Sequence, residues 1–371
     1  MRYKNIYCFQ KKEEKWWTTL MQVAVPFFIA GCGTIGAGLV LGYIVSLEVF
    51  MNISAIFVLV PSLSGLKGNL DMCLASRLST QANLGNMEST KELISMVIGN
   101  ISLVQVQAIV AATVVSMFAI VINSITDRGV SGPTILLLTA SAVFTATTTC
   151  FVLDFVMVMV IYGSHKLKVN PDNVATPLAA SIGDIVSNTV LAVTAQYMYE
   201  QIKISLWQPI ALICVYYSLL PLWVFVVWRN KYTKKVLTSG WTPVISALFI
   251  SGIGGIVLDQ AVDHYRGYEV FQPIVNGIGG NLVYHYKIRL SIDLRLQVII
   301  FQSLHQVMVL LYLAYILIHF MWKKKKDPDN AAIPYLTALG DLLGSVFLAL
   351  IASHWFSLSL NLGPRRPGLE A

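Results

Sequence analysis

The sequence predicts an all-α protein that is embedded in a lipid bilayer and crosses it about ten times. The first observation is composition: 56% of the 371 residues are hydrophobic and 12% are charged, whereas soluble domains carry about 25% charged residues. The second is the length of the apolar stretches, many of which reach the roughly 20 residues that a membrane helix needs. A β-barrel is disfavoured, because its strands would read as alternating segments of about ten residues.

The candidate membrane helices are separated by short polar or charged segments. Each candidate is a predominantly apolar run close to the length of a membrane span. We expect helices near residues 18–48, 53–75, 93–124, 134–163, 174–199, 206–228, 241–262, 270–286, 297–322 and 332–356.

The formal net charge of +7 is best explained by loops on the cytoplasmic side of the membrane. Nucleic-acid binding is not expected, because no RNA- or DNA-binding motif accompanies the basic residues. Alternate crossings from a cytoplasmic N-terminus place most basic loops inside, including residues 229–235. The run Lys323–Lys326 breaks this pattern, since the same alternation places it outside.

Two segments recur in the same order along the chain. Residues 61–79 match residues 273–291 at eight of 19 positions with an offset of 212. Residues 171–184 match residues 328–341 at seven of 14 positions with an offset of 157. We therefore predict two homologous halves joined by an unpaired linker helix. An even number of crossings before the second half makes the repeat parallel, and such halves would enclose a central path.

The two offsets differ by 55 residues, which is enough for one helix and a loop. The second half is therefore expected to lack about one helix. The unexpected side of the run Lys323–Lys326 has the same explanation, because one helix fewer reverses the side of the loop that follows. The alternative is that residues 270–292 dip into the membrane and return without crossing, which would restore the alternation.

These observations predict five regions along the chain. They are a short cytoplasmic N-terminus (1–17), a first membrane half (18–205), a linker helix with a cytoplasmic loop (206–240), a shortened second half (241–356) and a C-terminal tail (357–371).

The repeated motif Pro-x₃-Gly-x₂-Gly-Asn provides the first candidate site residues. Proline and glycine weaken a helix in mid-membrane, and freed carbonyl groups there need protein, water or an ion as partners. Asn69 and Asn281 add side-chain oxygens beside the break. The alternative is close helix packing through small residues.

Two acidic pairs complete the candidate set. Asp184 and Asp341 lie well inside apolar helices at equivalent positions, where an unpaired carboxylate costs several kcal/mol. Two such carboxylates facing one axis could attract a hard cation such as Mg²⁺; the alternative is a protonated, hydrogen-bonded aspartic acid. Asp172 and Asp329 precede their helices and could form an outer cation site at the cytoplasmic mouth, or be ordinary helix caps. Asp154 has no repeat partner and is a weaker candidate.

Other kinds of site are not expected. The five cysteines form no CxxC pair, so neither a disulfide framework nor a zinc site is predicted. No nucleophile–base set and no Walker motif is present, which argues against an enzyme or an ATP-driven pump. No resident cofactor is expected.

At the repeated motifs the chain resembles solute carrier family 41, the animal relatives of bacterial MgtE-type magnesium channels. The resemblance rests on the runs that begin at Pro61 and Pro334 and covers nearly the whole chain. It implies a divalent-cation transporter with two fused five-helix halves, Mg²⁺ as the transported substrate and Na⁺ as the coupling ion for efflux. It also implies that Asp184 and Asp341 line the central ion site, that Asn69 and Asn281 are the motif asparagines, and that Asp172 and Asp329 lie near the cytoplasmic entrance.

The sequence departs from this family in the shortened second half. One alternative is therefore a transport-incompetent variant that associates with full-length relatives and alters their assembly. Another is a transporter of a different divalent cation such as Mn²⁺, which carboxylate and amide ligands do not exclude. The expected location is the plasma membrane, with an organelle membrane as the alternative, and self-association or association with related transporters is a candidate partnership.

Overall fold

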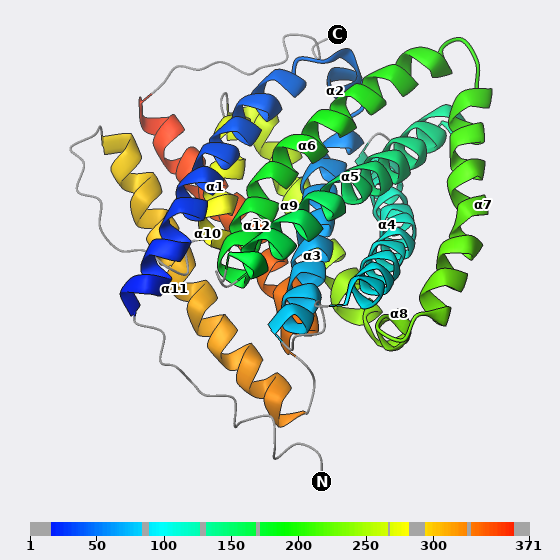
Figure 1. The fold of residues 1–371 in the computed structure, drawn as a ribbon. Helices are drawn as coiled ribbons and strands as arrows, with labels where there is room; N and C mark the ends of the chain where they lie inside the picture. The colour runs from blue at the N-terminus through cyan, green and yellow to red at the C-terminus, as the bar shows by residue number, and fades with distance from the viewer. Residues whose placement is uncertain are drawn as a thin grey trace.

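Helices are the only regular secondary structure in the part of the chain that the structure describes (Figure 1). The computed structural model describes residues 16–83, 89–126, 131–167, 171–265, 268–281, 294–324 and 328–359. Its helices are α1 (Trp16–Ile44), α2 (Glu48–Asn52), α3 (Ala55–Asn83), α4 (Thr90–Thr126), α5 (Gly132–Lys166), α6 (Pro171–Ile202), α7 (Trp207–Arg229), α8 (Lys234–Ser239), α9 (Trp241–His264), α10 (Tyr268–Asn281), α11 (Leu294–Lys323) and α12 (Pro328–Ser359). The predicted all-α architecture is confirmed.

Each predicted membrane span falls on one long helix, apart from the short α10. Among the described residues, six helices contain a stretch long and apolar enough to cross a membrane: α4, α5, α7, α9, α11 and α12. The central helices α3 and α6 instead carry polar residues such as Lys67, Asp71 and Asp184. The length and composition of these helices are those of a polytopic membrane protein.

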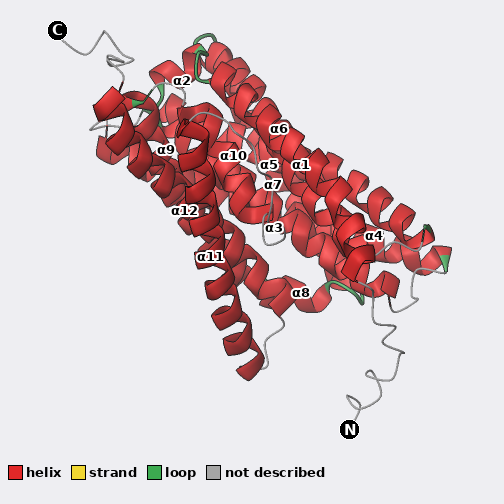
Figure 2. Ribbon diagram, turned by 90° about the vertical axis from the view of Figure 1, so that its left-hand side faces the viewer, coloured by secondary structure: helices red, strands yellow, loops and turns green. Residues whose placement is uncertain are grey.

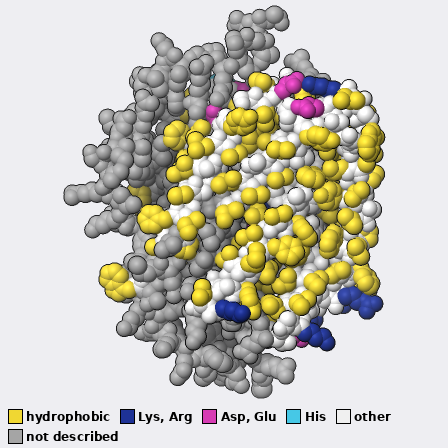
Figure 3. Space-filling view, turned by 45° about the horizontal axis from the view of Figure 1, so that its top comes forward, with side chains coloured by type: hydrophobic (Ala, Val, Ile, Leu, Met, Phe, Trp, Pro, Cys, Tyr) yellow, Lys and Arg dark blue, Asp and Glu magenta, His cyan; other side chains and the backbone are white. Residues whose placement is uncertain are grey.

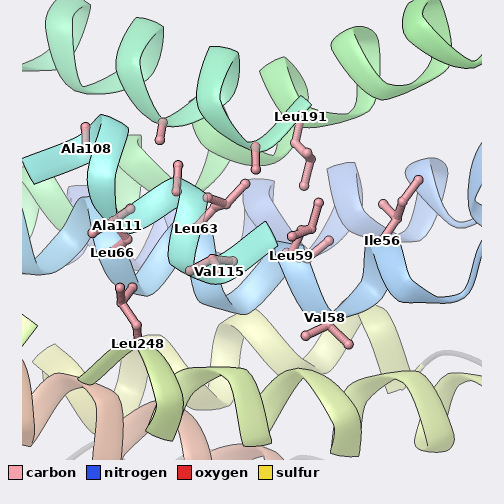
Figure 4. Close-up of a cluster of buried hydrophobic side chains, with 14 of the residues drawn as sticks. Ile56, Val58, Leu59, Leu63, Leu66, Ala108, Ala111, Val115, Leu191 and Leu248 are labelled. Atoms are coloured by element: carbon pink, nitrogen blue, oxygen red, sulfur yellow. The ribbon is translucent and has the colours of Figure 1, made fainter. Parts of the chain in front are cut away.

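Helix α3 lies at the centre of the molecule, because it packs against α4, α5, α6, α9 and α12. Its apolar side chains, such as Leu59 and Leu63, are buried. They gather with Val115 of α4 and Leu248 of α9 in one hydrophobic cluster (Figure 4). Burial on several sides encloses the polar residues of α3 within the protein and keeps them away from lipid.

The first helix of each half packs against a helix of the other half. Helix α1 packs against α6 and α10, and helix α9 packs against α12 and α3. A Cβ atom at Gly38 of α1 would overlap the carbonyl oxygen of Val270 in α10. A Cβ atom at Gly255 of α9 would lie 2.9 Å from Cα of Val58 in α3. Val58 and Val270 are 212 positions apart, which is the offset of the first repeated segment. The contact of α1 with α10 therefore corresponds to the contact of α9 with α3.

Helix α7 lies at the edge of the molecule and joins the two halves. It packs mainly against α4 and α5, and only 6% of its most apolar window is buried inside the protein. Leu222, Phe225 and Trp228 are among its exposed side chains. In Figure 3 hydrophobic side chains cover the visible face between charged groups at its two edges, as expected of a surface that faces lipid.

The lysines at the end of α11 lie on the same side of the molecule as α8. In Figure 1 helix α11 runs downward to Lys323, and in both Figure 1 and Figure 2 its end lies with α8 on the lower side. The expectation that Lys323–Lys326 falls on the opposite side is therefore wrong for Lys323 and Lys324, the two lysines of this run that the structure describes.

The segment between α9 and α11 explains this correction. Counting residues 270–286 as a full crossing reversed the expected direction of the helices that follow. The alternative, in which this segment enters the membrane without crossing, agrees with the direction of α11; residues 282–293 lie outside the described part.

Basic side chains on the lower side lie over aromatic rings. The Arg229 guanidinium is 5.1 Å from the centroid of the Phe225 ring, and Lys324 Nζ is 4.5 Å from the centroid of the Phe320 ring. Cation–π pairs of this kind suit a membrane–water interface, where an apolar stem and a charged tip are both accommodated. Lys203 Nζ, between α6 and α7, lies 4.1 Å from the centroid of the Tyr199 ring in the same way, so pairs of this kind occur at the ends of several helices.

Candidate cation site

A cavity of about 80 Å³ lies where four helices meet: α3, α6, α10 and α12. Helices α3 and α10 carry the two copies of the first repeated segment, and α6 and α12 carry the two copies of the second. Asp184 of α6 and Asp341 of α12 both line the cavity. The fold therefore brings together the two carboxylates that are 157 positions apart in the sequence.

The repeated proline and glycine positions form part of the cavity wall. Pro61 and Gly65 of α3 and the equivalent residues of the repeat, Pro273 and Gly277 of α10, all line the cavity. A Cβ atom at Gly65 would lie 3.2 Å from Oδ2 of Asp341. The missing side chain at this position therefore leaves room for the carboxylate beside the backbone of α3.

Asn69 is buried next to the cavity and has a direct partner in the other half. The hydroxyl of Thr337, which lines the cavity, donates a hydrogen bond to Oδ1 of Asn69. Asn69 therefore positions a residue of the cavity wall. The side chains of Asn281, Asp172 and Asp329 lie outside the described residues, although their backbones belong to α10, α6 and α12.

Several amide and hydroxyl groups of the cavity were missed by reasoning from the sequence. Asn276 lines the cavity, and its Oδ1 is buried without a hydrogen-bond partner among the described residues. Asn188 also lines it, and its Oδ1 accepts a hydrogen bond of 3.1 Å from Ser64 Oγ. Two signals could have indicated them: Asn188 follows Asp184 by one helical turn, and Asn276 lies inside the repeated Pro-x₃-Gly motif.

The donor set of the cavity suits a hard cation. Carboxylate, amide and hydroxyl oxygens are the ligands that Mg²⁺ and Ca²⁺ prefer in proteins. In the described part of the chain, no three His, Cys, Asp or Glu side chains come together. A cation between Asp184 and Asp341 would therefore complete its coordination with amide oxygens and retained water, as Mg²⁺ tends to do.

A second group of buried charges lies behind the cavity, within the first half. Lys67 Nζ is 2.9 Å from Oδ2 of Asp71, and both side chains are buried. Asp154 of α5 is fully buried and close enough to interact electrostatically with Lys67, Asp71 and Arg77. Neither carboxylate oxygen of Asp154 has a hydrogen-bond partner among the described residues. Asp154 thus belongs to this group and does not line the cavity.

Comparison with known sequences gives the family. The sequence model of the MgtE family, described as "Divalent cation transporter", matches residues 60–194 and 274–351. These two matches include Asp184 and Asp341.

The chain belongs to the MgtE family of divalent cation transporters.

Several animal members of this family align over most of the chain. Solute carrier family 41 member 2 of Mus musculus is 38% identical over 89% of this chain and 69% of its own length. Member 2 of Homo sapiens is 37% identical over 89% of this chain and 69% of its own length, and member 3 of Rattus norvegicus is 32% identical over 90% and 86%. No solved structure matches.

Membership of the MgtE family settles the broad class of the protein. The resemblance to solute carrier family 41 is confirmed, and the chain is a multi-pass membrane transporter and not an enzyme. A divalent cation is its substrate class.

Proposed function

We propose that this MgtE-family chain moves Mg²⁺ across the bilayer along a path between its two halves. The observation that supports this most directly is that Asp184 and Asp341, from equivalent helices, line one cavity. Facing carboxylates attract a divalent cation, and neutral oxygens such as that of Asn276 complete a site for a hard ion. The small cavity favours an ion that sheds only part of its water.

The finer features of this proposal follow from the family resemblance. Mg²⁺ efflux would be coupled to Na⁺, and the protein would act in the plasma membrane. Asn69 and Asn281 would flank the path, and Asp172 and Asp329 would attract cations at the cytoplasmic end of α6 and α12. No resident cofactor is needed, since the cation is the substrate.

Flux measurements test the proposal. The purified chain is reconstituted into vesicles, and Mg²⁺ uptake is compared between the unmodified chain and the double variant Asp184→Asn/Asp341→Asn. We expect flux from the unmodified chain and its loss in the double variant. The matched control, Glu48→Gln/Glu200→Gln, removes two exposed carboxylates and should keep the flux. Equal flux from all three proteins would contradict a site at Asp184 and Asp341.

The shortened second half supports one other candidate function. Helix α11 packs against α12 and α10 as α5 packs against α6 and α3, which leaves α4 without a counterpart among the described helices. A chain altered in this way could associate with full-length relatives and modulate them without transporting ions. No flux from correctly inserted protein, together with changed flux from a co-reconstituted relative, would favour this second candidate.

A further inference from the structure

Lys67 of α3 places a buried positive charge beside the cavity. Its side chain is 2% exposed, and Nζ lies 2.9 Å from Oδ2 of Asp71. The same ammonium group lies against α6, because a Cβ atom at Gly183 would overlap Nζ. Gly183 directly precedes Asp184 in α6. The ammonium group is therefore paired with Asp71 and packed against the segment of α6 that carries Asp184.

The charge of Lys67 acts on Asp184, whereas the neighbouring charge that acts on Asp341 is Asp184 itself. The repeat explains this asymmetry. Position 279, the equivalent of Lys67, is glycine, and position 283, the equivalent of Asp71, is valine. The second half therefore has no counterpart of the Lys67–Asp71 pair, although it repeats the carboxylate of the cavity.

A fixed cation so close to a cation site has a large electrostatic effect. Repulsion between charges inside a protein is screened much less than in water, and it doubles when one of the charges is divalent. Lysine suits this role, because its ammonium is a compact point charge on a flexible four-carbon stem. A small movement of Nζ from Asp71 toward Asp184 would neutralise a ligand of the transported ion.

We propose that Lys67 is a tethered cation that weakens the hold of the central site on its divalent ion and thereby promotes release. Asp71 is the group that holds the ammonium back, so that the site can fill. The inference rests on the proposed cation site at Asp184 and Asp341 and adds to it a residue that sets affinity.

Other charges of the first half do not substitute for Lys67. Arg77 lies nearly three turns further along α3, and its Nε donates a hydrogen bond of 2.9 Å to Oδ1 of Asn100 in α4. Asp154 interacts electrostatically with Lys67, Asp71 and Arg77, but neither Asp154 nor Arg77 lines the cavity. Of these groups, Lys67 is the one whose ammonium contacts the α6 backbone beside Asp184.

Calorimetric titration of MgCl₂ into the full chain in detergent tests the inference. The variants are chosen so that some should raise the affinity for Mg²⁺ and another should lower it. Lys67→Gln removes the positive charge alone, and we expect the affinity for Mg²⁺ to rise by about tenfold or more. Lys67→Met/Asp71→Leu removes the whole pair while keeping its volume and, because the pair has no net charge, should raise the affinity by less. Asp71→Asn removes the negative charge that offsets the ammonium of Lys67, and we expect the affinity to fall by a similar factor. The double variant tests the first direction again should Lys67→Gln fail to fold.

Two further proteins separate failure of the inference from failure of the proposed function. Asp184→Asn/Asp341→Asn should abolish binding, which tests the site itself. Lys231→Gln/Glu92→Gln removes an exposed ion pair of 2.8 Å and should leave affinity unchanged. Unchanged affinity in the folded Lys67 and Asp71 variants, with binding still dependent on Asp184 and Asp341, would overturn the tethered-cation inference alone. Absence of binding by the unmodified chain would overturn both.

Discussion

Gly255 of α9 packs directly against the backbone of Val58 in α3, at the contact between the two halves of the molecule. A Cβ atom at Gly255 would lie 2.9 Å from Cα and 3.0 Å from the carbonyl oxygen of Val58. Backbone atoms cannot turn aside as the end of a flexible side chain can. The distance between the halves is therefore fixed by the absence of a side chain at this position.

We predict that Gly255→Ala destabilises the protein by about 1–3 kcal/mol, because overpacking of a close contact forces the backbone to shift. Gly31→Ala is the matched control, since a Cβ atom there meets nothing within 4 Å and alanine favours a helix over glycine. Thermal unfolding in detergent would compare the two variants. Equal melting temperatures would contradict the close approach of α9 and α3.

Asn276→Ala is expected to weaken Mg²⁺ binding by about tenfold, the equivalent of roughly 1.4 kcal/mol, because an amide side chain that lines the cavity is lost. Asn123→Ala is the control: its Oδ1 is also buried without a partner among the described residues, but it lies in α4 away from the cavity. Titration of both variants with MgCl₂ would show whether the loss is specific. A similar loss in both would argue for a general effect on the fold.

The direction of α11 predicts which residues share one side of the membrane. In a background without native cysteines, Lys324→Cys and Lys231→Cys should react with an impermeant maleimide from the same side of sealed vesicles. Lys203→Cys, between α6 and α7, should react from the opposite side. Labelling of Lys324→Cys together with Lys203→Cys would mean that α11 runs in the other direction.

The ion pair between Lys203 and Glu48 predicts a small pH dependence. The 2.8 Å hydrogen bond to Glu48 raises the pKa of Lys203 above its ordinary value of 10.5. Because the pKa is higher in the folded state, stabilisation by the pair is complete below the unfolded pKa and is lost as pH rises through the folded pKa.

Glu48→Gln should therefore be less stable than the unmodified chain near pH 8 and equally stable well above pH 11, roughly one unit beyond the pKa of a free lysine. Melting temperatures measured across this range check the convergence. Glu200→Gln, with a carboxylate at the same end of α6, should show no such convergence. A difference for Glu48→Gln that persists at high pH would exclude the ion pair as its cause.

Much of the fold follows from the sequence alone, because lipid imposes a simple requirement. A segment that crosses the bilayer must be apolar over about 20 residues and helical, so helices such as α4 and α7 can be placed by counting. Helix α10 shows where this fails. Hydropathy registers that residues near 270–286 are apolar, but it does not register in which direction α11 then runs.

The candidate site was predictable where symmetry marked it. Asp184 and Asp341 repeat at one spacing, and a repeated carboxylate in an apolar helix has few structural explanations. Asn188, Asn276 and Thr337 were missed, because polar residues on such helices become ligands only when the rotation and pairing of distant helices turn them toward one cavity. The spacing of Lys67 and Asp71 allows an i,i+4 pair on one helix, but its burial and its position beside α6 could not be seen until α3 was placed in the middle of the molecule.

The asymmetry at position 67 has a consequence for how such a molecule can change. In a dimer of identical subunits, every substitution beside the central axis occurs twice, so a lysine next to the ion would confront it from both walls. A single chain with two halves avoids this doubling. One wall can carry Lys67 while the other carries glycine at position 279, and the charge around the ion can change in steps of one elementary unit instead of two.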